Sequence, residues 1–366
     1  MDKKNTGFRG FFKQIDFLLL APVLVLVAVS LLTLFSINPL FFRQQGGALI
    51  IALFAFFIFS KVDLGILAFS SKFIYVLIII LLILILIFGI EVNNARSWFD
   101  FFGVRVQISE IAKPFFLVVL ATFFAKNIKK NIYRFLGFFA IVFPVFYLIA
   151  KQPDLGTGIV FFSASMLVFF LGGFQKRYLL ATFLSALIVI PALFFVLQDY
   201  QKQRILTFFD ITSDPTGASY NAIQSLISIG SGGLFGKGFG QGTQSLLRFL
   251  PEQHNDFIFA TISEDLGFIG SFVVLCLFSL LLYRIYKIAT LSKNKYEYFL
   301  CMGIFGLFFF QILFNVGMNL GLMPIIGVTL PFVSHGGSSL LSSFIALSMV
   351  SNISYENKKK QSMEIM

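Results

Sequence analysis

Four carboxylates lie within fourteen residues of this chain, at the start of a long apolar run. They belong to Glu252, Asp256, Glu264 and Asp265, in a sequence that is only 12% charged and 58% hydrophobic. A carboxylate in or beside a membrane is costly unless it is paired, solvated or used. Asp256 directly precedes the apolar residues 257–259, which predicts a helix N-cap at a water boundary. Acids so placed line a cleft from its mouth inward, so we expect any chemical site of this chain here.

The rest of the chain must position these acids within a membrane. Its 366 residues include 52 Phe, and continuous apolar runs such as 73–90 match the roughly 20 residues that cross a bilayer. The alternation of a β-barrel is absent. The sequence predicts an all-α, polytopic membrane protein of about ten transmembrane helices, the first of them retained rather than cleaved as a signal peptide. The ten runs lie near 17–36, 46–60, 73–90, 110–125, 135–150, 155–172, 178–197, 257–283, 298–320 and 338–353.

The net charge of +11 is distributed unevenly between the two sides that ten spans define. Most Lys and Arg residues fall on the side of both termini, which the positive-inside rule makes cytoplasmic. The basic balance therefore reflects topology and contact with membrane lipid, and no nucleic acid is implied. We expect a single transmembrane domain over 1–366, with a large extracytoplasmic loop at 198–256 between helices 7 and 8. A flexible cytoplasmic tail is expected at 354–366.

Several motifs have a structural interpretation beside a functional one. The glycine-rich segment 230–242 does not match a phosphate loop or a dinucleotide fingerprint, which favours a tightly turned loop that permits close backbone packing. His254 and His335 are the only histidines and make a weak zinc site, so we interpret them as structural. Cys276 and Cys301 both lie in apolar runs and are interpreted as core residues.

Charged residues beside the apolar runs complete the candidate site. Asp154 follows Pro153 and is either a helix cap or a second functional carboxylate; the local sequence leaves both open. Ser109 is predicted to cap a helix in which Glu110 and Lys113, one turn apart, form an ion pair. Four basic residues on the outer side could together bind a polyanion, because Arg forks onto phosphate oxygens: Arg43, Arg96, Lys113 and Arg204.

These motifs, taken in order, resemble the SEDS family of cell-wall polymerases. The resemblance rests on segments that include KQPDLGT at 151–157, FLPEQHNDFIF at 249–259 and GLMPIIGVTLPFVSHGGSS at 321–339, with Asp214 and Pro215 between them. It covers nearly the whole chain and favours the elongation branch, RodA, over the division branch, FtsW. Asn255 departs from the family pattern, which has Thr before the aspartate.

The resemblance implies a peptidoglycan glycosyltransferase of the bacterial inner membrane that polymerises lipid II on the outer face, for cell elongation and rod shape. The reaction would be an inverting displacement of undecaprenyl pyrophosphate, with Asp256 as catalytic general base. No nucleotide is needed, and a divalent cation, Mg²⁺ or Mn²⁺, is implied with its ligands unknown. Lipid II and the glycan strand would be bound by Arg43, Arg96, Lys113, Asp154, Arg204, Glu110 and Glu264.

The implied partners are a class B penicillin-binding protein, which is a transpeptidase, and other proteins of the elongation complex. Two other functions compete with the polymerase. A lipid II flippase would carry charged residues deep within several spans and broken helices, whereas most polar residues here lie outside the apolar runs. A non-catalytic scaffold of the cell-wall synthesis complex would not need the acids and bases of the outer side.

Overall fold

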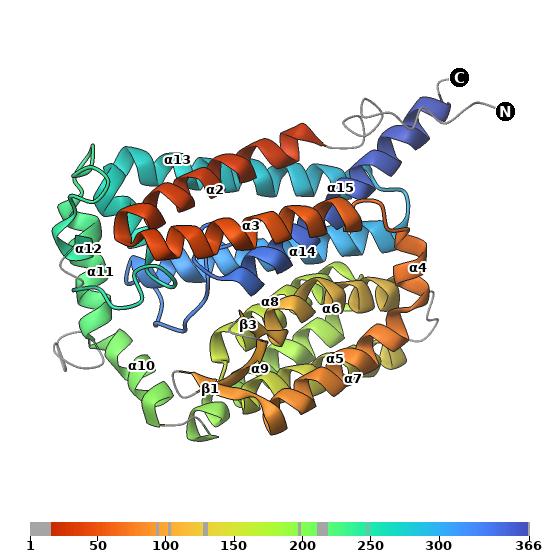
Figure 1. Ribbon diagram of the computed structural model, residues 1–366. Coiled ribbons are helices and arrows are strands. Elements are labelled where there is room, and N and C mark those ends of the chain that lie inside the picture. Colours follow the sequence, from red (N-terminus) through yellow and green to blue (C-terminus); the bar gives the residue numbers. More distant parts are fainter. Residues whose placement is uncertain are drawn as a thin grey trace.

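The computed structural model describes residues 16–92, 95–101, 104–126, 131–196, 199–210, 219–246 and 249–364. Asp214 and Pro215, and the basic residues at 3–13, lie outside the described residues. The chain forms a helical bundle whose long helices run roughly side by side (Figure 1). The long helices are α2 (Phe17–Ile37), α3 (Pro39–Phe59), α5 (Ser71–Phe88), α6 (Ile108–Ala125), α7 (Asn131–Lys151), α8 (Leu155–Leu171), α9 (Lys176–Val196), α13 (Ile258–Leu291), α14 (Lys295–Asn319) and α15 (Gly337–Glu364).

Each predicted span corresponds to one of these helices, which confirms the all-α polytopic fold. In the described part of the chain, eight helices are long and apolar enough to cross a membrane; α8 is a shorter apolar helix of 17 residues. α14 occupies the middle of the bundle and packs against α6, α8, α13 and α15. Because lipid tails are as apolar as Leu, such packing rather than burial from water must hold the helices together.

Phenylalanine rings supply much of that packing. Phe138 of α7 lies 4.9 Å, between ring centroids, from Phe169 of α8, and Phe169 stacks on Phe174 at 4.4 Å. Phe124 of α6 contacts both Phe138 and Phe174, at 5.8 and 6.0 Å. Offset and edge-to-face ring pairs are worth more than their buried area alone, which suits a chain so rich in Phe. Tyr178, at the start of α9, joins this cluster through Phe135 at 5.2 Å.

The segments between the long helices contain structure that the sequence did not predict. The described residues of 90–107 form an antiparallel sheet in the order β1–β2–β3. Its β-branched and aromatic residues suit strands, and Asp100 pairs with Arg105 across β2 and β3. The segment 198–256, expected as a long loop, contains three helices. The elements are β1 (Ile90–Val92), β2 (Ala95–Phe101), β3 (Val104–Gln107), α4 (Leu64–Phe69), α10 (Asp199–Phe209), α11 (Tyr220–Ser231) and α12 (Thr243–Leu246).

α2 begins and α15 ends at the same end of the bundle (Figure 1). Asp16, directly before α2, accepts a hydrogen bond from Arg284 Nη2 of α13 at 2.6 Å and another from Ser354 Oγ of α15. Residues 354–364, predicted as a flexible tail, instead continue α15 to Glu364. The tail prediction failed because its polar residues bind other helices: Asn357 Nδ2 donates to the carbonyl of Ile288 at 3.3 Å.

α13 is kinked at Gly267, where φ is 68° and ψ is −164°. A kink frees backbone groups that lipid cannot satisfy, and here the segment 230–242 satisfies them. The Lys237 amide donates to the carbonyl of Glu264 at 3.0 Å, and the Gly238 amide donates to that of Asp265 at 2.9 Å. The Lys237 ammonium also binds the fully buried Glu264 carboxylate at 3.0 Å. The interpretation of this segment as a close-packing loop is confirmed.

Gly267→Ala should destabilise the protein. Only glycine adopts this backbone region without a cost of about 1–3 kcal/mol, and a Cβ would lie 2.3 Å from the Gly236 nitrogen. Gly230→Ala is the matched control, because a Cβ there meets nothing within 4 Å. The midpoint of thermal unfolding in detergent should fall for Gly267→Ala and stay unchanged or rise for the control. Equal midpoints would contradict the packing described here.

Candidate active site

Asp256 lies two residues before the start of α13, but it does not cap that helix. The N-cap position is Phe257, and no side chain accepts a hydrogen bond there. The predicted capping role of Asp256 is therefore wrong, because a turn over residues 251–257 shifts the aspartate out of the cap position. Its carboxylate is not committed to the helix end and is available for another function.

Two buried asparagines of α14 hold the backbone of Asp256 in place. Asn315 Nδ2 and Asn319 Nδ2 each donate to the carbonyl oxygen of Asp256, both at 2.9 Å. Asn315 also donates to the carbonyl of Val328 at 2.7 Å, and Asn319 Oδ1 accepts from the Ala260 amide at 3.1 Å. Both side chains are fully buried. They join α14, the start of α13 and the segment 320–336, and thereby fix where the Asp256 side chain begins.

Sequence reasoning missed this pair of asparagines. Their signal is two amide side chains one helical turn apart within an apolar run, in the sequence QILFNVGMN at 311–319. A buried amide must find partners, and one on a membrane helix marks a point where another segment approaches. Which segment approaches is not encoded locally, since Asp256 is 59 residues from Asn315.

The segment 320–336 brings the Asp154 region beside Asp256 through two glycines. A Cβ on Gly327, whose φ is +70°, would lie 3.3 Å from Asp256 Oδ2. A Cβ on Gly156 would lie 2.4 Å from the carbonyl oxygen of Gly327. A side chain at Gly156 would clash with this carbonyl, and the positive φ of Gly327 favours glycine at that position. The start of α8, this segment and the start of α13 therefore meet at one place.

Asp154 is the N-cap of α8, which is one of the two roles that the sequence left open. Its Oδ1 accepts from the Thr157 amide at 3.1 Å at the start of α8. Its Oδ2 accepts from Gln107 Nε2 at 2.7 Å and from Ser109 Oγ at 3.4 Å. Burial raises the pKa of Asp154, although hydrogen bonds from Thr157 oppose the rise; the Glu110 charge adds to it and the Lys113 charge counters it.

Glu110 and Lys113 form the predicted ion pair at the start of α6. Lys113 Nζ lies 2.5 Å from Glu110 Oε1, and the two side chains are 3% and 6% exposed. The other oxygen, Glu110 Oε2, is buried with no hydrogen-bond partner among the described residues. Ser109 does not cap this helix as predicted, because α6 begins earlier, at Ile108, with Gln107 as N-cap. This pair lies close enough to Asp154 to influence its ionisation.

Arg204 is a cation whose charge acts on Asp256. Its Nη1 donates to the carbonyl of Ile325 at 3.4 Å, which places the guanidinium beside the segment that contains Gly327. Burial raises the pKa of Asp256 to about 6; the charges of Glu252 and Asp154 add to the rise and that of Arg204 opposes it. A carboxylate of this pKa is mostly ionised at neutral pH and still basic enough to accept a proton.

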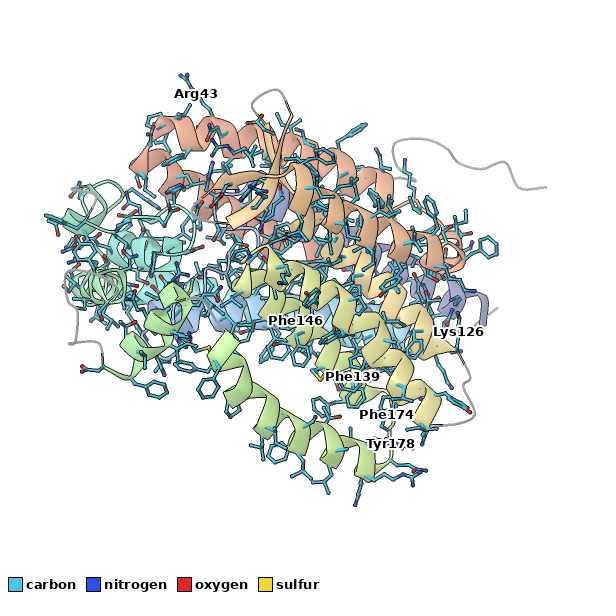
Figure 2. All side chains as sticks on the ribbon, turned by 90° about the horizontal axis from the view of Figure 1, so that it is seen from below. Arg43, Lys126, Phe139, Phe146, Phe174 and Tyr178 are labelled. Atoms are coloured by element: carbon cyan, nitrogen blue, oxygen red, sulfur yellow. The ribbon has the colours of Figure 1, made fainter. Side chains whose placement is uncertain are left out.

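The structure does not bring every predicted residue to this place. Arg43 on α3 and Arg96 on β2 are exposed, and Figure 2 shows Arg43 pointing away from the bundle. Glu264 lies further along the chain, within α13, and its carboxylate binds Lys237 Nζ and the Gln244 amide, each at 3.0 Å. Substrate binding by these three residues stays a prediction. Asp256, Asp154, Glu110, Lys113 and Arg204 are the predicted residues that interact.

His254 and His335 lie beside the site as structural residues. The His254 ring stacks on Phe41 at 4.2 Å between centroids, and His335 donates its amide to the His254 carbonyl at 2.9 Å. Burial lowers the pKa of both imidazoles, that of His335 to about 4 with help from His254. Both are therefore neutral at physiological pH and add no charge to the site.

A resident divalent cation does not fit the described residues. No cluster of three or more His, Cys, Asp or Glu side chains suited to a metal occurs among them. Both carboxylate oxygens of Asp154 already accept hydrogen bonds, from Gln107, Ser109 and Thr157.

Asn319→Leu should lower stability because it leaves the Ala260 amide without a side-chain partner and removes one donor from the Asp256 carbonyl. Each buried polar group left unpaired costs about 1–3 kcal/mol. Ser348→Ala is the control: its hydroxyl is equally buried but bonds only to Ile345 in its own helix. Thermal unfolding should show a lower midpoint for Asn319→Leu than for the control. Identical midpoints would contradict the anchoring role.

Comparison with known proteins identifies the family. A family model described as "Cell cycle protein", which covers FtsW, RodA and SpoVE, matches residues 9–359. The chain is 37% identical over 290 residues to the peptidoglycan glycosyltransferase MrdB of Escherichia coli strain K12, which covers 79% of this chain and 78% of MrdB. It is 35% identical over 363 residues to stage V sporulation protein E of Bacillus subtilis, which covers 93% and 96% of the two chains.

Solved structures agree. One similar chain, from the structure described as "Structural coordination of polymerization and crosslinking by a peptidoglycan synthase complex", has a TM-score of 0.83 at 28% identity and covers 94% of this chain and 98% of its own. The rod shape determining protein RodA of Thermus thermophilus has a TM-score of 0.72 at 26% identity, covering 94% and 97%. The chain belongs to the FtsW/RodA/SpoVE family, the SEDS family.

Proposed function

We propose that this chain is a peptidoglycan glycosyltransferase that polymerises lipid II into glycan strands. The observation that carries the proposal is the carboxylate of Asp256, whose backbone is anchored by two buried asparagines and whose pKa is raised to about 6. The name of MrdB and the family membership support the same activity.

In the proposed reaction Asp256 acts as general base. The acceptor sugar hydroxyl gives its proton to the Asp256 carboxylate as its oxygen forms a bond to the anomeric carbon of the donor. The bond from that carbon to the pyrophosphate oxygen breaks, and the electron pair leaves with undecaprenyl pyrophosphate. A single displacement inverts the configuration of the donor sugar. Pyrophosphate is a weak base, so no separate general acid is required.

Arg204 is the basic residue that would stabilise the charge that develops on the leaving group. Arg204 is exposed beside the site, and its fork of donors suits phosphate oxygens. Lys113 is buried against Glu110, so its charge offsets the acids Glu110 and Asp154 rather than standing open to substrate. A divalent cation, Mg²⁺ or Mn²⁺, would then arrive with the pyrophosphate as part of the substrate.

The site would face outward from the bacterial inner membrane, with both termini in the cytoplasm. Charge supports this orientation. The end of the bundle near Asp16 holds many cations that the positive-inside rule places in the cytoplasm. Asp256 and Asp154 stand at helix ends away from Arg284, which lies near the far end of α13. Those cations include Lys61, Lys72, Lys176, Arg177, Arg284, Lys287, Lys293 and Lys295.

We further propose that the chain serves cell elongation and works with a class B penicillin-binding protein. The solved relative from a peptidoglycan synthase complex supports a transpeptidase partner. Similarity to MrdB and to RodA supports the elongation role. The division branch is also represented among the relatives: the probable peptidoglycan glycosyltransferase FtsW of Tolumonas auensis is 35% identical to this chain over 276 residues.

Asp256→Asn should abolish polymer formation while leaving the fold intact. The amide keeps the size of the side chain but cannot accept the proton, so the rate should fall by about 10²–10⁴-fold. Labelled lipid II, the purified protein with its transpeptidase partner and a gel of the products provide the measurement. The control is Asp63→Asn, an exposed carboxylate that caps α4. Near-normal polymer from Asp256→Asn would favour the scaffold function instead.

The acid limb of the pH–rate profile should lie near pH 6 and move predictably with two substitutions. Glu252→Gln removes a negative charge that raises the pKa of Asp256, so the limb should shift to lower pH. Arg204→Gln removes a positive charge that lowers this pKa, so the limb should shift to higher pH. Initial rates of polymer formation across the acid range provide the test. Shifts in the same direction, or none, would show that another group titrates.

Lys113→Met should abolish polymerisation, because the buried Glu110 and Asp154 lose the charge that offsets them. The double variant Lys113→Met with Glu110→Gln separates two roles. Activity that returns in the double variant would make Lys113 a charge-balancing residue. Activity that stays absent in a monodisperse double variant would assign Lys113 to pyrophosphate recognition.

A further inference from the structure

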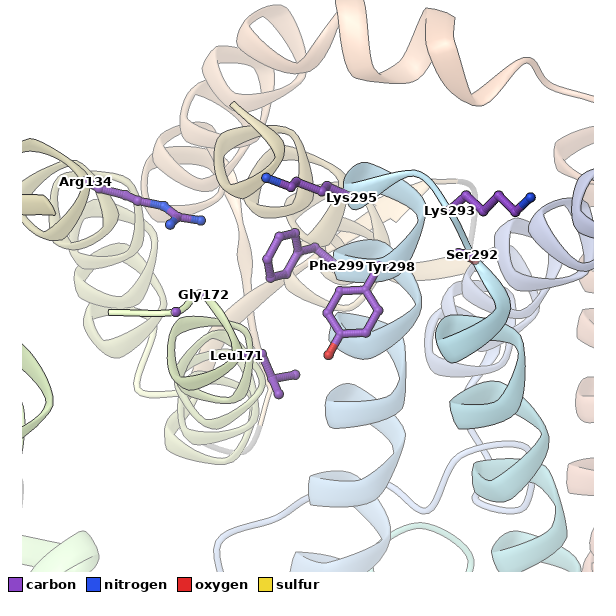
Figure 3. Close-up of a pocket in the computed structure, with 9 residues that line it drawn as sticks. Arg134, Leu171, Gly172, Ser292, Lys293, Lys295, Tyr298 and Phe299 are labelled. Carbon is purple, nitrogen blue, oxygen red and sulfur yellow. The ribbon is translucent and has the colours of Figure 1, made fainter. Parts of the chain in front are cut away.

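A cavity lies at the end of the bundle away from Asp256. It has a volume of 360 Å³ and lies where α7, the end of α8 and the start of α14 meet (Figure 3). Its lining contains cations and aromatic rings but no carboxylate: Arg134, Leu171, Gly172, Gly173, Ser292, Lys293, Lys295, Tyr298 and Phe299. Neither the polymerase mechanism nor the helix packing accounts for it.

Arg134 is held rigidly at one side of this cavity. Its guanidinium lies 5.0 Å from the ring centroid of Phe124 and 5.5 Å from that of Phe174. Its Nη2 donates to the Phe124 carbonyl at 3.1 Å. Its Nε is buried with no hydrogen-bond partner among the described residues. A guanidinium fixed between two rings loses little freedom when it binds an anion.

Lys295 faces Arg134 from the other side. In Figure 3 its ammonium points toward Arg134, whereas Lys293, two residues earlier, directs its ammonium away from the cavity. Lys295 is also the first residue of α14, so the positive end of that helix dipole faces the same space. Two opposed cations and a helix start, without a carboxylate in the lining, suit a phosphate group.

An apolar strip on α14 leads away from the cavity. Tyr298, Phe305, Phe309 and Leu313 are spaced 7, 4 and 4 residues apart, so they share one face of the helix. Phe309 and Leu313 are each 38% exposed, and Phe305 stacks on Phe309 with 5.9 Å between centroids. An anion attached to a hydrocarbon chain would contact both the cations and this strip.

We propose that this cavity binds the phosphate headgroup of an anionic phospholipid, with an acyl chain along the exposed face of α14. Two features favour a lipid over a free phosphate: the apolar strip on α14 and the position of the cavity at the predicted cytoplasmic face. Anionic lipids give that leaflet a negative potential, and basic pockets between membrane helices suit their headgroups. The site is separate from that of Asp256 and does not depend on the proposed polymerase activity.

The test is native mass spectrometry of the full chain in detergent, titrated with phosphatidylglycerol. Lys295→Gln should weaken binding of the first lipid by about fivefold or more, since charged pairs to phosphate are among the strong hydrogen bonds. Lys287→Gln, at an exposed lysine of α13 outside the cavity lining, is the control and should bind like the unmodified protein. Lys295→Arg should restore binding. Both lysines are exposed, so these variants are expected to fold, and size-exclusion chromatography verifies that they remain monodisperse.

Two outcomes would overturn the proposal. Equal losses in Lys287→Gln and Lys295→Gln would show general attraction to a basic surface rather than a built site. Displacement of the lipid by inorganic phosphate at equal concentration would show a small-anion site without a contribution from the acyl chain. Weak binding of phosphatidylcholine beside tight binding of phosphatidylglycerol would support recognition of the net negative charge.

Discussion

The site depends on one buried interaction, the hold that Asn315 and Asn319 exert on the carbonyl of Asp256. Inside a membrane bundle an amide side chain must find partners, and here both asparagines share the same acceptor. The free-energy cost of burying the two amides is offset only when the turn before α13 places the Asp256 carbonyl within reach of both. Asn315 also binds the segment 320–336, through the carbonyl of Val328. Asp256, the proposed general base, lies on a turn, yet these bonds position it as firmly as a residue on a helix.

The glycines of the site follow from the same constraint. Gly327 and Gly156 allow three backbones to approach closely enough that Asp154 influences the ionisation of Asp256. The kink at Gly267 works similarly: segment 230–242 supplies the amides that the broken helix lacks. Polar backbone at membrane depth is tolerated because protein, not lipid, surrounds it. The bundle of Phe-rich helices provides that enclosure, and the exposed Arg204 lies at its edge beside the Asp256 site.

Sequence reasoning predicted what depends on local composition. The spans were recognisable because their length is set by the bilayer, and the Glu110–Lys113 pair because its partners are one turn apart. Asp256 and Asp154 were chosen because acids beside apolar runs are costly, and the structure places them so that the charge of Asp154 raises the pKa of Asp256. The sheet at 90–107, the helices within 198–256 and the role of Asn319 depend on distant contacts. Arg43 and Arg96 could not be separated from Arg204 by sequence, because exposure and direction arise only when the segments pack.

The central claim is that Asp256 contributes a basic carboxylate and not merely a contact. Asp256→Ala opens space where that carboxylate stood, so added formate should accept the proton in its place. The claim predicts that polymer formation from lipid II by this variant rises with formate concentration, while the unmodified protein does not respond. Lipid II binding should stay unchanged in the variant. Polymer formation by Asp256→Ala at a near-normal rate without formate would contradict the account.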